Sequence, residues 1–193
     1  RSKFEITAFS LINNEDTIQK KLQQTFDKFI NIEGKSSNEI FESCREINID
    51  IAIDLNGFTF GNRLNIFAAK SAKKQISWCG YNNSLGIKNM DYIIADKNLI
   101  KKGEEKYYKE KIIYMPKIWN AMSKPENLPE INELPFKEND IFRFGSFNSF
   151  KKISDDVIKV WSKIINNSKC ELYLKNSGGY NKEIYDNLLK RFE

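Results

Sequence analysis

The segment from Phe144 to Ile153 carries residue types that could bind phosphate. A short apolar strand, predicted at residues 141–147, leads into a polar loop that ends in Lys152, and a helix follows with Ser154 as its predicted N-cap. In an open α/β sheet, ligands bind where strands give way to helices, and helix N-termini favour anions. Lys152 could therefore contact a diphosphate. On these residues alone, the alternative is a solvated lysine beside an ordinary N-cap.

Two further loops follow predicted strands, at residues 56–62 and 80–86. The glycines of the first loop permit close approach of backbone N–H groups to a ligand, and the small, amide-bearing residues of the second suit hydrogen bonding to a sugar or phosphate. The candidate ligand contacts in these loops are Gly57, Thr59, Gly80, Tyr81 and Asn82. The alternative for each loop is a structural turn. In a parallel sheet, all three loops would open on the same edge.

The sequence offers few candidate residues for acid–base catalysis or metal binding. Asp54 and Asp96 sit at the ends of predicted strands, where a carboxylate could act as a base, but a turn-forming or capping role is favoured. The sequence has 0 histidines, which removes imidazole bases and His-ligated metal sites from these residues. Its 3 cysteines lack paired spacing, so we expect free thiols in a reducing cytosol, without a disulfide framework or a zinc site.

The composition indicates a globular protein without a nucleic-acid or membrane function. Hydrophobic residues make up 40% of 193 residues, and 14 Phe and 8 Tyr suffice for a packed core. The net charge of +5 comes from lysines that are spread along the chain and interrupted by acids, so nucleic-acid binding is not expected. No apolar run reaches the length of a membrane span and no signal peptide is visible, so we expect a cytoplasmic protein without a membrane partner.

Alternating strands and helices must position the three loops. Short apolar or alternating runs predict the strands, and apolar residues at helical spacing predict the helices. The predicted strands are residues 4–9, 29–32, 49–55, 75–79, 91–95, 111–115, 141–147 and 172–174. The predicted helices are residues 16–26, 37–45, 63–70 and 155–165, with another from about 182. This rhythm is typical of βαβ units and a mainly parallel sheet.

The alternation breaks at residues 117–138, where Pro125, Pro129 and Pro135 occur without periodicity, which predicts a linker or extended crossover. We therefore predict an α/β fold of Rossmann-like parallel sheets with flanking helices. Its parts are an N-terminal domain at residues 1–116, a linker at 117–138 and the start of an incomplete second domain at 139–193.

In order and spacing, seven blocks of the sequence resemble the catalytic region of O-GlcNAc transferases, glycosyltransferase family 41. The blocks are residues 50–59 (DIAIDLNGFT), 61–68 (GNRLNIFA), 75–81 (QISWCGY), 90–96 (MDYIIAD), 105–111 (EKYYKEK), 114–116 (YMP) and 144–148 (FGSFN). Lys152, Ile153 and Trp161 continue the match, so the resemblance extends over residues 3–175.

The resemblance implies a GT-B fold, in which two Rossmann-like domains face each other across a cleft, commonly after tetratricopeptide repeats. It implies inverting transfer of N-acetylglucosamine from a UDP-sugar donor, UDP-GlcNAc, to Ser or Thr hydroxyls of a protein acceptor, without a metal or other cofactor. It also places the first strand of the N-terminal domain before Arg1 and most of the second domain after Glu193. These 193 residues alone are then expected to be inactive. A homo-oligomer could cover the open sheet edges.

By resemblance, Lys152 matches the catalytic lysine that contacts the nucleotide diphosphate and would stabilise charge on the leaving group. Asn148 and Ser149 match the adjoining donor-site loop, and residues 80–86 match the loop beside the transferred sugar. Asn82-Asn83 stands where the family usually has Pro-Gly, and the histidines near the family's acceptor site have no identical counterparts. The alternatives are therefore a relative that uses another donor, such as GDP-fucose, and a non-catalytic binding or scaffold module of the same fold.

Overall fold

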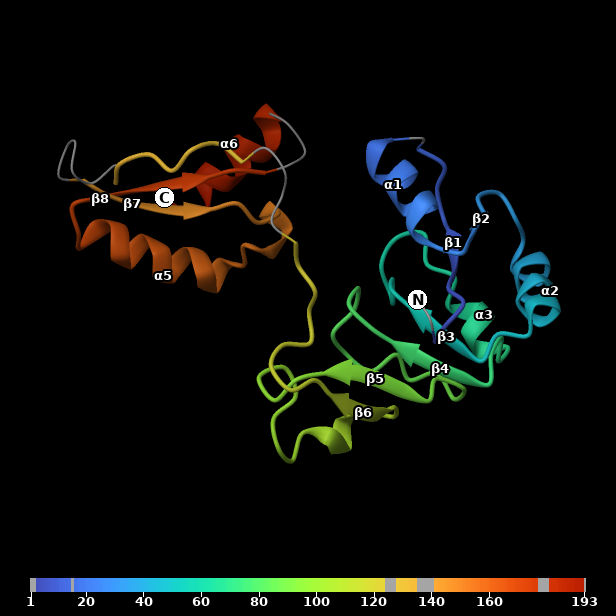
Figure 1. Ribbon diagram of the computed structural model, residues 1–193. Helices are drawn as coiled ribbons and strands as arrows, with labels where there is room; N and C mark the ends of the chain where they lie inside the picture. The colour runs from blue at the N-terminus through green and yellow to red at the C-terminus, as the bar shows by residue number, and fades with distance from the viewer. Residues whose placement is uncertain (1–2, 15, 124–127, 135–140, 177–180, 193) are drawn as a thin grey trace. The chain divides into compact units, whose positions relative to one another are not determined.

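The computed structural model describes residues 3–14, 16–123, 128–134, 141–176 and 181–192 (Figure 1). The chain divides into two compact units, Arg1–Lys124 and Pro125–Glu193. The division falls inside the segment 117–138 for which a linker is predicted. Among the described residues, no helix is long and apolar enough to cross a membrane.

All strand pairings in the two units are parallel. Unit 1 contains β1 (Thr7–Ser10), α1 (Thr17–Thr25), β2 (Lys28–Asn31), α2 (Ser37–Ile47), β3 (Ile51–Asp54), α3 (Leu64–Ala68), β4 (Lys74–Ser77), β5 (Tyr92–Ala95), the 3₁₀ helix η1 (Glu105–Tyr107) and β6 (Lys111–Tyr114). Unit 2 contains β7 (Phe142–Ser146), the 3₁₀ helix η2 (Phe150–Lys152), α5 (Asp155–Asn166), β8 (Cys170–Leu174) and α6 (Lys182–Lys190). The sheets are β1–β2, β3-β4-β5-β6 in that order, and β7–β8. The predicted α/β class with parallel sheets and flanking helices is confirmed.

The largest difference from the predicted elements lies at the start of unit 1. The strand predicted from residue 4 begins only at Thr7, because the backbone N–H of Ile6 donates to the Asp27 carboxylate, 2.8 Å away, and so has a side-chain partner in place of a strand partner. The carbonyl of Ile6 then accepts from the backbone N–H groups of Asp27 and Lys28. The two 3₁₀ helices were not among the predicted elements.

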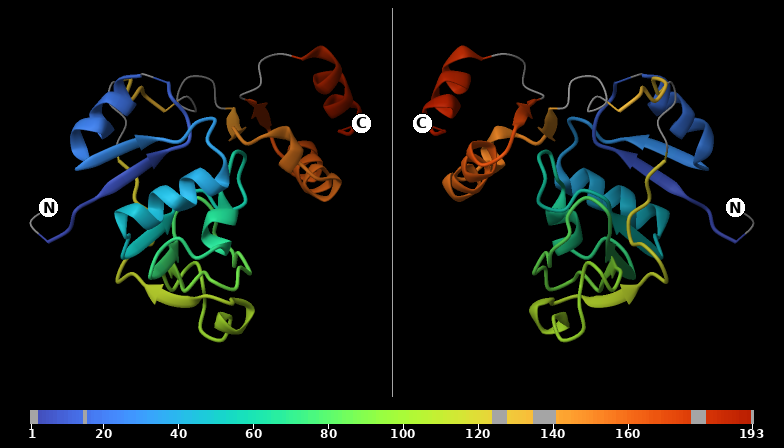
Figure 2. Two further views of the ribbon diagram at one scale, coloured as in Figure 1. Left: turned by 90° about the vertical axis from the view of Figure 1, so that its right-hand side faces the viewer. Right: turned by 90° about the vertical axis from the view of Figure 1, so that its left-hand side faces the viewer.

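Helix α2 illustrates how the sequence sets an element's ends. A capping box begins it: the Glu39 N–H donates to the Ser36 hydroxyl, and the Ser36 N–H donates to the Glu39 carboxylate. Asn48 ends it in the left-handed conformation, with φ 55°. Between these ends, Ile40 and Cys44 are spaced one helical turn apart and are both buried. Helix α2 therefore presents one apolar face, beside α3 and the β1–β2 pair (Figure 2).

Unit 1 has three buried apolar clusters. They are Ile32, Ile40, Cys44 and Ile66; Leu64, Leu85 and Met90; and Ile93, Ala95 and Ile100. The first joins α2 and α3 to the end of β2, the second packs α3 against the segment after β4, and the third supports β5. Among the described residues of unit 1, these clusters pack the helices and connecting segments around the strands.

Strands β1 and β3 each have one edge without a paired strand within the described part of the chain. The β1–β2 pair lies beyond β3, on the side of the four-stranded sheet away from β6 (Figures 1 and 2). The carbonyls of Asp50 and Asp54 accept from β4 and the residue that follows it, so the backbone groups of Ile51 and Ile53 point to the other edge. The Ile51 and Ile53 side chains are 50% and 47% exposed, so this edge is also apolar.

Unit 2 packs α5 and α6 around its own core. Ile153, Ile158 and Leu188 form the buried cluster, and Trp161 and Leu174 pack against it. The N–H of Val157 donates to the Ser154 hydroxyl, so the predicted N-cap of α5 is confirmed. The Arg191 guanidinium, just after α6, donates to the Ile153 carbonyl at 2.7 Å and pairs with Asp155 at 2.8 Å. The end of α6 is thereby tied to the start of α5.

Candidate functional site

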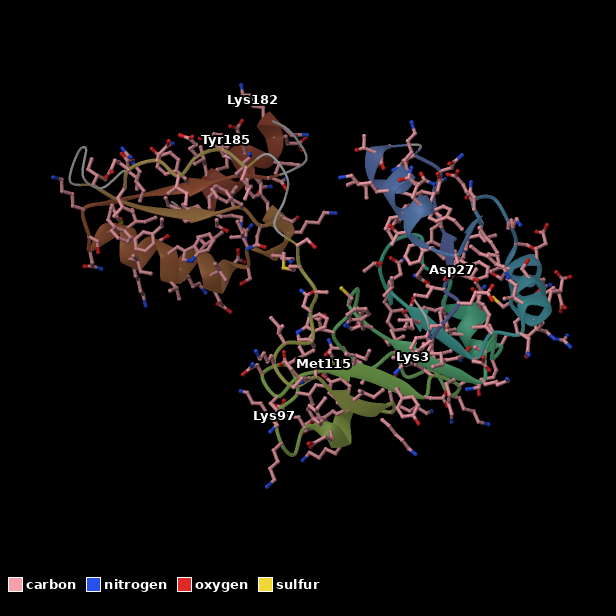
Figure 3. All side chains as sticks on the ribbon, in the orientation of Figure 1. Lys3, Asp27, Lys97, Met115, Lys182 and Tyr185 are labelled. Carbon is pink, nitrogen blue, oxygen red and sulfur yellow. The ribbon has the colours of Figure 1, made fainter. Side chains whose placement is uncertain are left out.

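The carboxyl ends of β3 to β6 form one edge of the four-stranded sheet, and two of the three candidate loops lie there. Residues 56–62 follow β3 and residues 80–86 follow β4. Figure 3 labels two residues of the same edge, Lys97 after β5 and Met115 after β6. In open parallel sheets, this is the edge at which ligands bind.

The two loops are in direct backbone contact. Gly57 has φ +58°, and a Cβ at this position would overlap the Cβ of Tyr81. A Cβ at Gly80 would overlap the backbone carbonyl of Leu55. The rings of Phe58 and Tyr81 pack edge to face, with centroids 5.4 Å apart. Glycine is therefore required at both positions, and the structure brings Gly57, Gly80 and Tyr81 together.

Asp54 binds the backbone at the start of the first loop. Its carboxylate accepts from the backbone N–H groups of Asn56 at 3.2 Å and Gly57 at 2.8 Å. Burial raises the pKa of Asp54 above its ordinary value, although the Gly57 and Asn56 hydrogen bonds act in the opposite direction. Because its oxygens hold the turn, Asp54 is the turn-forming acid that the sequence favours.

Asp96 plays a related part at the ends of β5 and β6. One carboxylate oxygen accepts from the N–H groups of Asn98 and Leu99, at 2.8 and 2.9 Å, and the other accepts from the Trp119 N–H at 2.9 Å. The Leu99 and Trp119 hydrogen bonds hold the pKa of Asp96 below its ordinary value. The Trp119 carbonyl in turn accepts from Trp78 Nε1 at 2.7 Å, so the segments after β4, β5 and β6 are linked. An open hollow of about 370 Å³ lies here, lined by Asp96, Asn98, Leu99, Lys117, Ile118 and Trp119.

Thr59 lies within the first loop and has a partner there. Its hydroxyl donates to the Asn56 carbonyl at 2.9 Å, and its own carbonyl accepts from the Asn62 side-chain amide at 2.9 Å. Two buried donors of this segment, Asn56 Nδ2 and Arg63 Nε, have no hydrogen-bond partner within the described residues.

Glu110, at the amino end of β6, contacts the second loop of this site, and apart from its place in the family-resembling block 105–111 nothing in the sequence marks it. It lies just before β6, is 4% exposed and accepts hydrogen bonds from Ser84 and Leu85 of the second loop. Its neighbours in the Lys-Tyr-Tyr-Lys-Glu-Lys run are polar and mostly exposed, so no periodicity distinguishes this acid from a solvated one.

The third candidate loop belongs to unit 2. Asn148 and Ser149 follow β7, and Lys152 lies in η2, where its N–H donates to the Ser149 carbonyl at 2.9 Å. All three residues are exposed, and Lys152 is two positions before the N-cap of α5. The expectation that all three loops open on one sheet edge is wrong, because β7 pairs with β8 and not with the sheet of unit 1.

Metal ligands do not gather in the described residues. No group of three or more His, Cys, Asp or Glu side chains that could hold a metal ion is found there. Cys44, Cys79 and Cys170 are free thiols.

Parallel α/β units, with a glycine-containing sheet edge in one and a lysine-bearing strand-to-helix crossing in the other, are typical of GT-B-type glycosyltransferases. A solved structure, a lysine-to-methionine variant of O-GlcNAc transferase from Thermobaculum terrenum, has this fold: it matches with a TM-score of 0.87 at 25% sequence identity, over 97% of this chain and 36% of that chain. The sequence profile of Glycosyl transferase family 41 matches residues 1–133. The chain belongs to this family, and the resemblance to O-GlcNAc transferases is confirmed.

Several curated relatives are also similar. The probable UDP-N-acetylglucosamine–peptide N-acetylglucosaminyltransferase SPINDLY of Eustoma exaltatum subsp. russellianum is 26% identical over 166 residues, which are 84% of this chain and 18% of that protein. The UDP-N-acetylglucosamine–peptide N-acetylglucosaminyltransferase of Caenorhabditis elegans is 33% identical over 118 residues, which are 60% of this chain and 10% of that protein. The chain thus spans less than a fifth of the length of these relatives.

Proposed function

We propose that the full-length protein is an inverting glycosyltransferase that moves N-acetylglucosamine from UDP-GlcNAc to Ser or Thr hydroxyls of a protein acceptor, without a metal. The observation that carries this proposal is the match to family 41 along residues 1–133, which includes both loops at the edge of the four-stranded sheet. Of the relatives named above, the Caenorhabditis elegans protein is a UDP-N-acetylglucosamine–peptide N-acetylglucosaminyltransferase, and the Eustoma protein is named as a probable one.

In this proposal, the ammonium group of Lys152 contacts the diphosphate of the donor. The exposed side chain of Lys152 stands between a strand end and a helix N-terminus, and its positive charge would stabilise the charge that develops on UDP as the sugar leaves. Asn148 and Ser149 would contact the same part of the donor. Since no ion is then needed to neutralise the leaving group, the reaction could proceed without a metal.

The two loops of unit 1 would contact the sugar. Gly80, Tyr81 and Asn82 carry exposed or half-exposed backbone at the end of β4, and Gly57 and Thr59 lie in the adjoining loop. Backbone N–H groups and short polar side chains fix the orientation of a hydroxyl-rich ligand, which is what an in-line displacement at the anomeric carbon requires.

The test is calorimetric binding of UDP and UDP-GlcNAc to the full-length protein and its Lys152→Ala variant. Lys151→Ala is the matched control, because Lys151 is an exposed lysine of the same 3₁₀ turn. We expect Lys152→Ala to weaken UDP binding roughly tenfold or more, because a charge-assisted contact is lost, and to lower turnover strongly while the fold survives. We expect Lys151→Ala to bind UDP normally. Equal binding by the two variants, or normal turnover by Lys152→Ala, would exclude the proposed role.

The same measurement separates the alternatives. Binding of GDP in preference to UDP would indicate another sugar nucleotide, such as GDP-fucose, as donor. Binding of no nucleotide by the unsubstituted protein would indicate a non-catalytic module.

We also propose a cytoplasmic location, which is supported by the three free cysteines, since oxidising compartments favour disulfides. A homo-oligomer would use strand edges that have no paired strand within the described residues.

A further inference from the structure

Glu110 is a buried acid whose carboxylate needs hydrogen-bond donors. It directly precedes β6 and is 4% exposed. Without donors around it, burial of the ionised carboxylate would cost a large desolvation free energy. Within the described residues, the donors that meet it come from the loop after β4.

Two hydrogen bonds join the Glu110 carboxylate to this loop. The Ser84 hydroxyl donates to Oε2 at 2.6 Å, and the Leu85 backbone N–H donates to Oε1 at 2.8 Å. The two oxygens therefore hold two consecutive residues, one through its side chain and one through its backbone. Hydrogen bonds to an ionised carboxylate are about twice as strong as bonds between neutral groups.

The residues on either side of these contacts add to the attachment. The Ser84 hydroxyl oxygen also accepts from the N–H groups of Gly86 and Lys109, at 3.2 and 3.3 Å. The Tyr108 hydroxyl donates to the Asn82 carbonyl at 3.4 Å. The segment 108–110 thus holds the loop at three positions, residues 82, 84 and 85.

The loop itself has a buried half and an exposed half. Leu85 packs in the buried cluster with Leu64 and Met90, whereas Gly80 and Asn82 are exposed. Close packing of Gly80 on the Leu55 carbonyl fixes the loop's beginning, and Glu110 fixes its end. The exposed backbone between these two points is therefore restrained at both ends.

We infer that Glu110 is a positioning residue that fixes the loop of residues 80–86 so that its exposed backbone meets the sugar, and not the nucleotide, of a bound sugar nucleotide. The inference rests on the proposed function. The predicted diphosphate contact, Lys152, lies in unit 2, so a change at Glu110 affects a different part of the donor. Affinity for the sugar and affinity for the nucleotide should then respond separately.

The experiment compares Glu110→Ala and Glu110→Gln in the full-length protein, with Glu46→Gln as a control at an exposed acid. One readout is hydrogen exchange at the Leu85 amide, and the other is the pair of affinities for UDP and UDP-GlcNAc. For Glu110→Ala we expect Leu85 exchange and the dissociation constant for UDP-GlcNAc to rise about tenfold, with UDP affinity unchanged. Glu110→Gln should show smaller increases in Leu85 exchange and in the dissociation constant for UDP-GlcNAc, because its amide oxygen can still accept from the Leu85 N–H. Ser84→Ala, which removes only the hydroxyl, gives the same readouts if Glu110→Ala fails to fold.

The outcomes separate this inference from the proposed function. Faster exchange at Leu85 with unchanged affinity for UDP-GlcNAc overturns the role of Glu110 in placing the sugar, and so does an equal loss of UDP and UDP-GlcNAc affinity. Failure of the unsubstituted protein to bind UDP-GlcNAc overturns the proposed function and the sugar-placing role together. Unchanged Leu85 exchange in Glu110→Ala contradicts the attachment itself, whatever the protein binds.

Discussion

At the scale of single residues, Asp54 and Asp96 both stand at the end of a strand, but their pKa values shift in opposite directions. Asp54 is the last residue of β3 and Asp96 comes directly after β5, and each accepts from backbone N–H groups of the turn that follows. Burial dominates at Asp54 and raises its pKa, whereas hydrogen bonds dominate at Asp96 and lower its pKa. Position at a strand end predicts the turn. It does not predict the direction of the pKa shift, which depends on burial and on donors from distant segments, such as the Trp119 N–H at Asp96.

The lowered pKa of Asp96 predicts an acid-sensitive contribution to stability. Because its pKa in the folded protein lies below the ordinary value of 3.8, ionised Asp96 stabilises the fold at all pH values above 3.8. This contribution is lost as the pH falls through the pKa of the folded state. We therefore expect the stability difference between the unsubstituted protein and Asp96→Asn to be constant near neutral pH and to shrink below pH 3.8.

Urea unfolding at a series of pH values measures this difference. Glu46→Gln, at an exposed acid, serves as the control for loss of a carboxylate. A difference that stays the same down to strongly acidic pH would mean that the charge of Asp96 contributes nothing and that only its shape matters.

At the scale of helices and strands, local sequence carried most of the information. The capping residues Ser36 and Ser154 begin helices where expected, and the β-branched run around Ile53 forms a strand. Contacts between residues that are far apart in the sequence could not be predicted from local patterns. Gln75 looks like an ordinary strand residue but is 0% exposed, because its amide bonds to Ser71, Phe67 and Asn89. The tie from Glu110 to the loop after β4 was hidden for the same reason: its partners are 25 and 26 residues away.

The open edge of β3 predicts alternating protection of its amide hydrogens. The N–H groups of Ala52 and Asp54 face β4, whereas those of Ile51 and Ile53 face the edge without a paired strand. We expect the Ile51 and Ile53 amides to exchange with solvent faster than those of Ala52 and Asp54, because exchange requires no opening of the sheet. Hydrogen exchange followed by NMR resolves the four amides. Equal protection at all four would show that another strand covers this edge.

At the scale of the whole molecule, each unit has its own hydrophobic core. The clusters around Ile40, Leu64 and Ile93 lie in unit 1, and the cluster around Ile158 lies in unit 2. We therefore expect a cavity in one core to destabilise that unit in particular. Ile158→Ala and Ile93→Ala are matched changes, since both isoleucines are buried, and each should cost its own unit about 2–5 kcal/mol.

Tryptophan fluorescence distinguishes the units, because Trp161 lies in unit 2 and Trp78 and Trp119 lie in unit 1. Urea unfolding of each variant in a Trp161→Phe background reports unit 1 alone, and a background that retains only Trp161 reports unit 2. Ile158→Ala should move the transition of Trp161 and leave that of the other two tryptophans in place. A common shift of both transitions would contradict independent cores.

The contact between the loops after β3 and β4 has a consequence for the design of chimeras. Gly57 leaves room for Tyr81, Gly80 leaves room for the Leu55 carbonyl, and Phe58 packs on the Tyr81 ring. A bulkier residue in one loop therefore fits only after a matching change in the other loop. Substitutions in the two loops are thus expected to be coupled. In the proposed function, where these loops contact the sugar, a graft that exchanges donor preference between members of the family would have to carry both loops together.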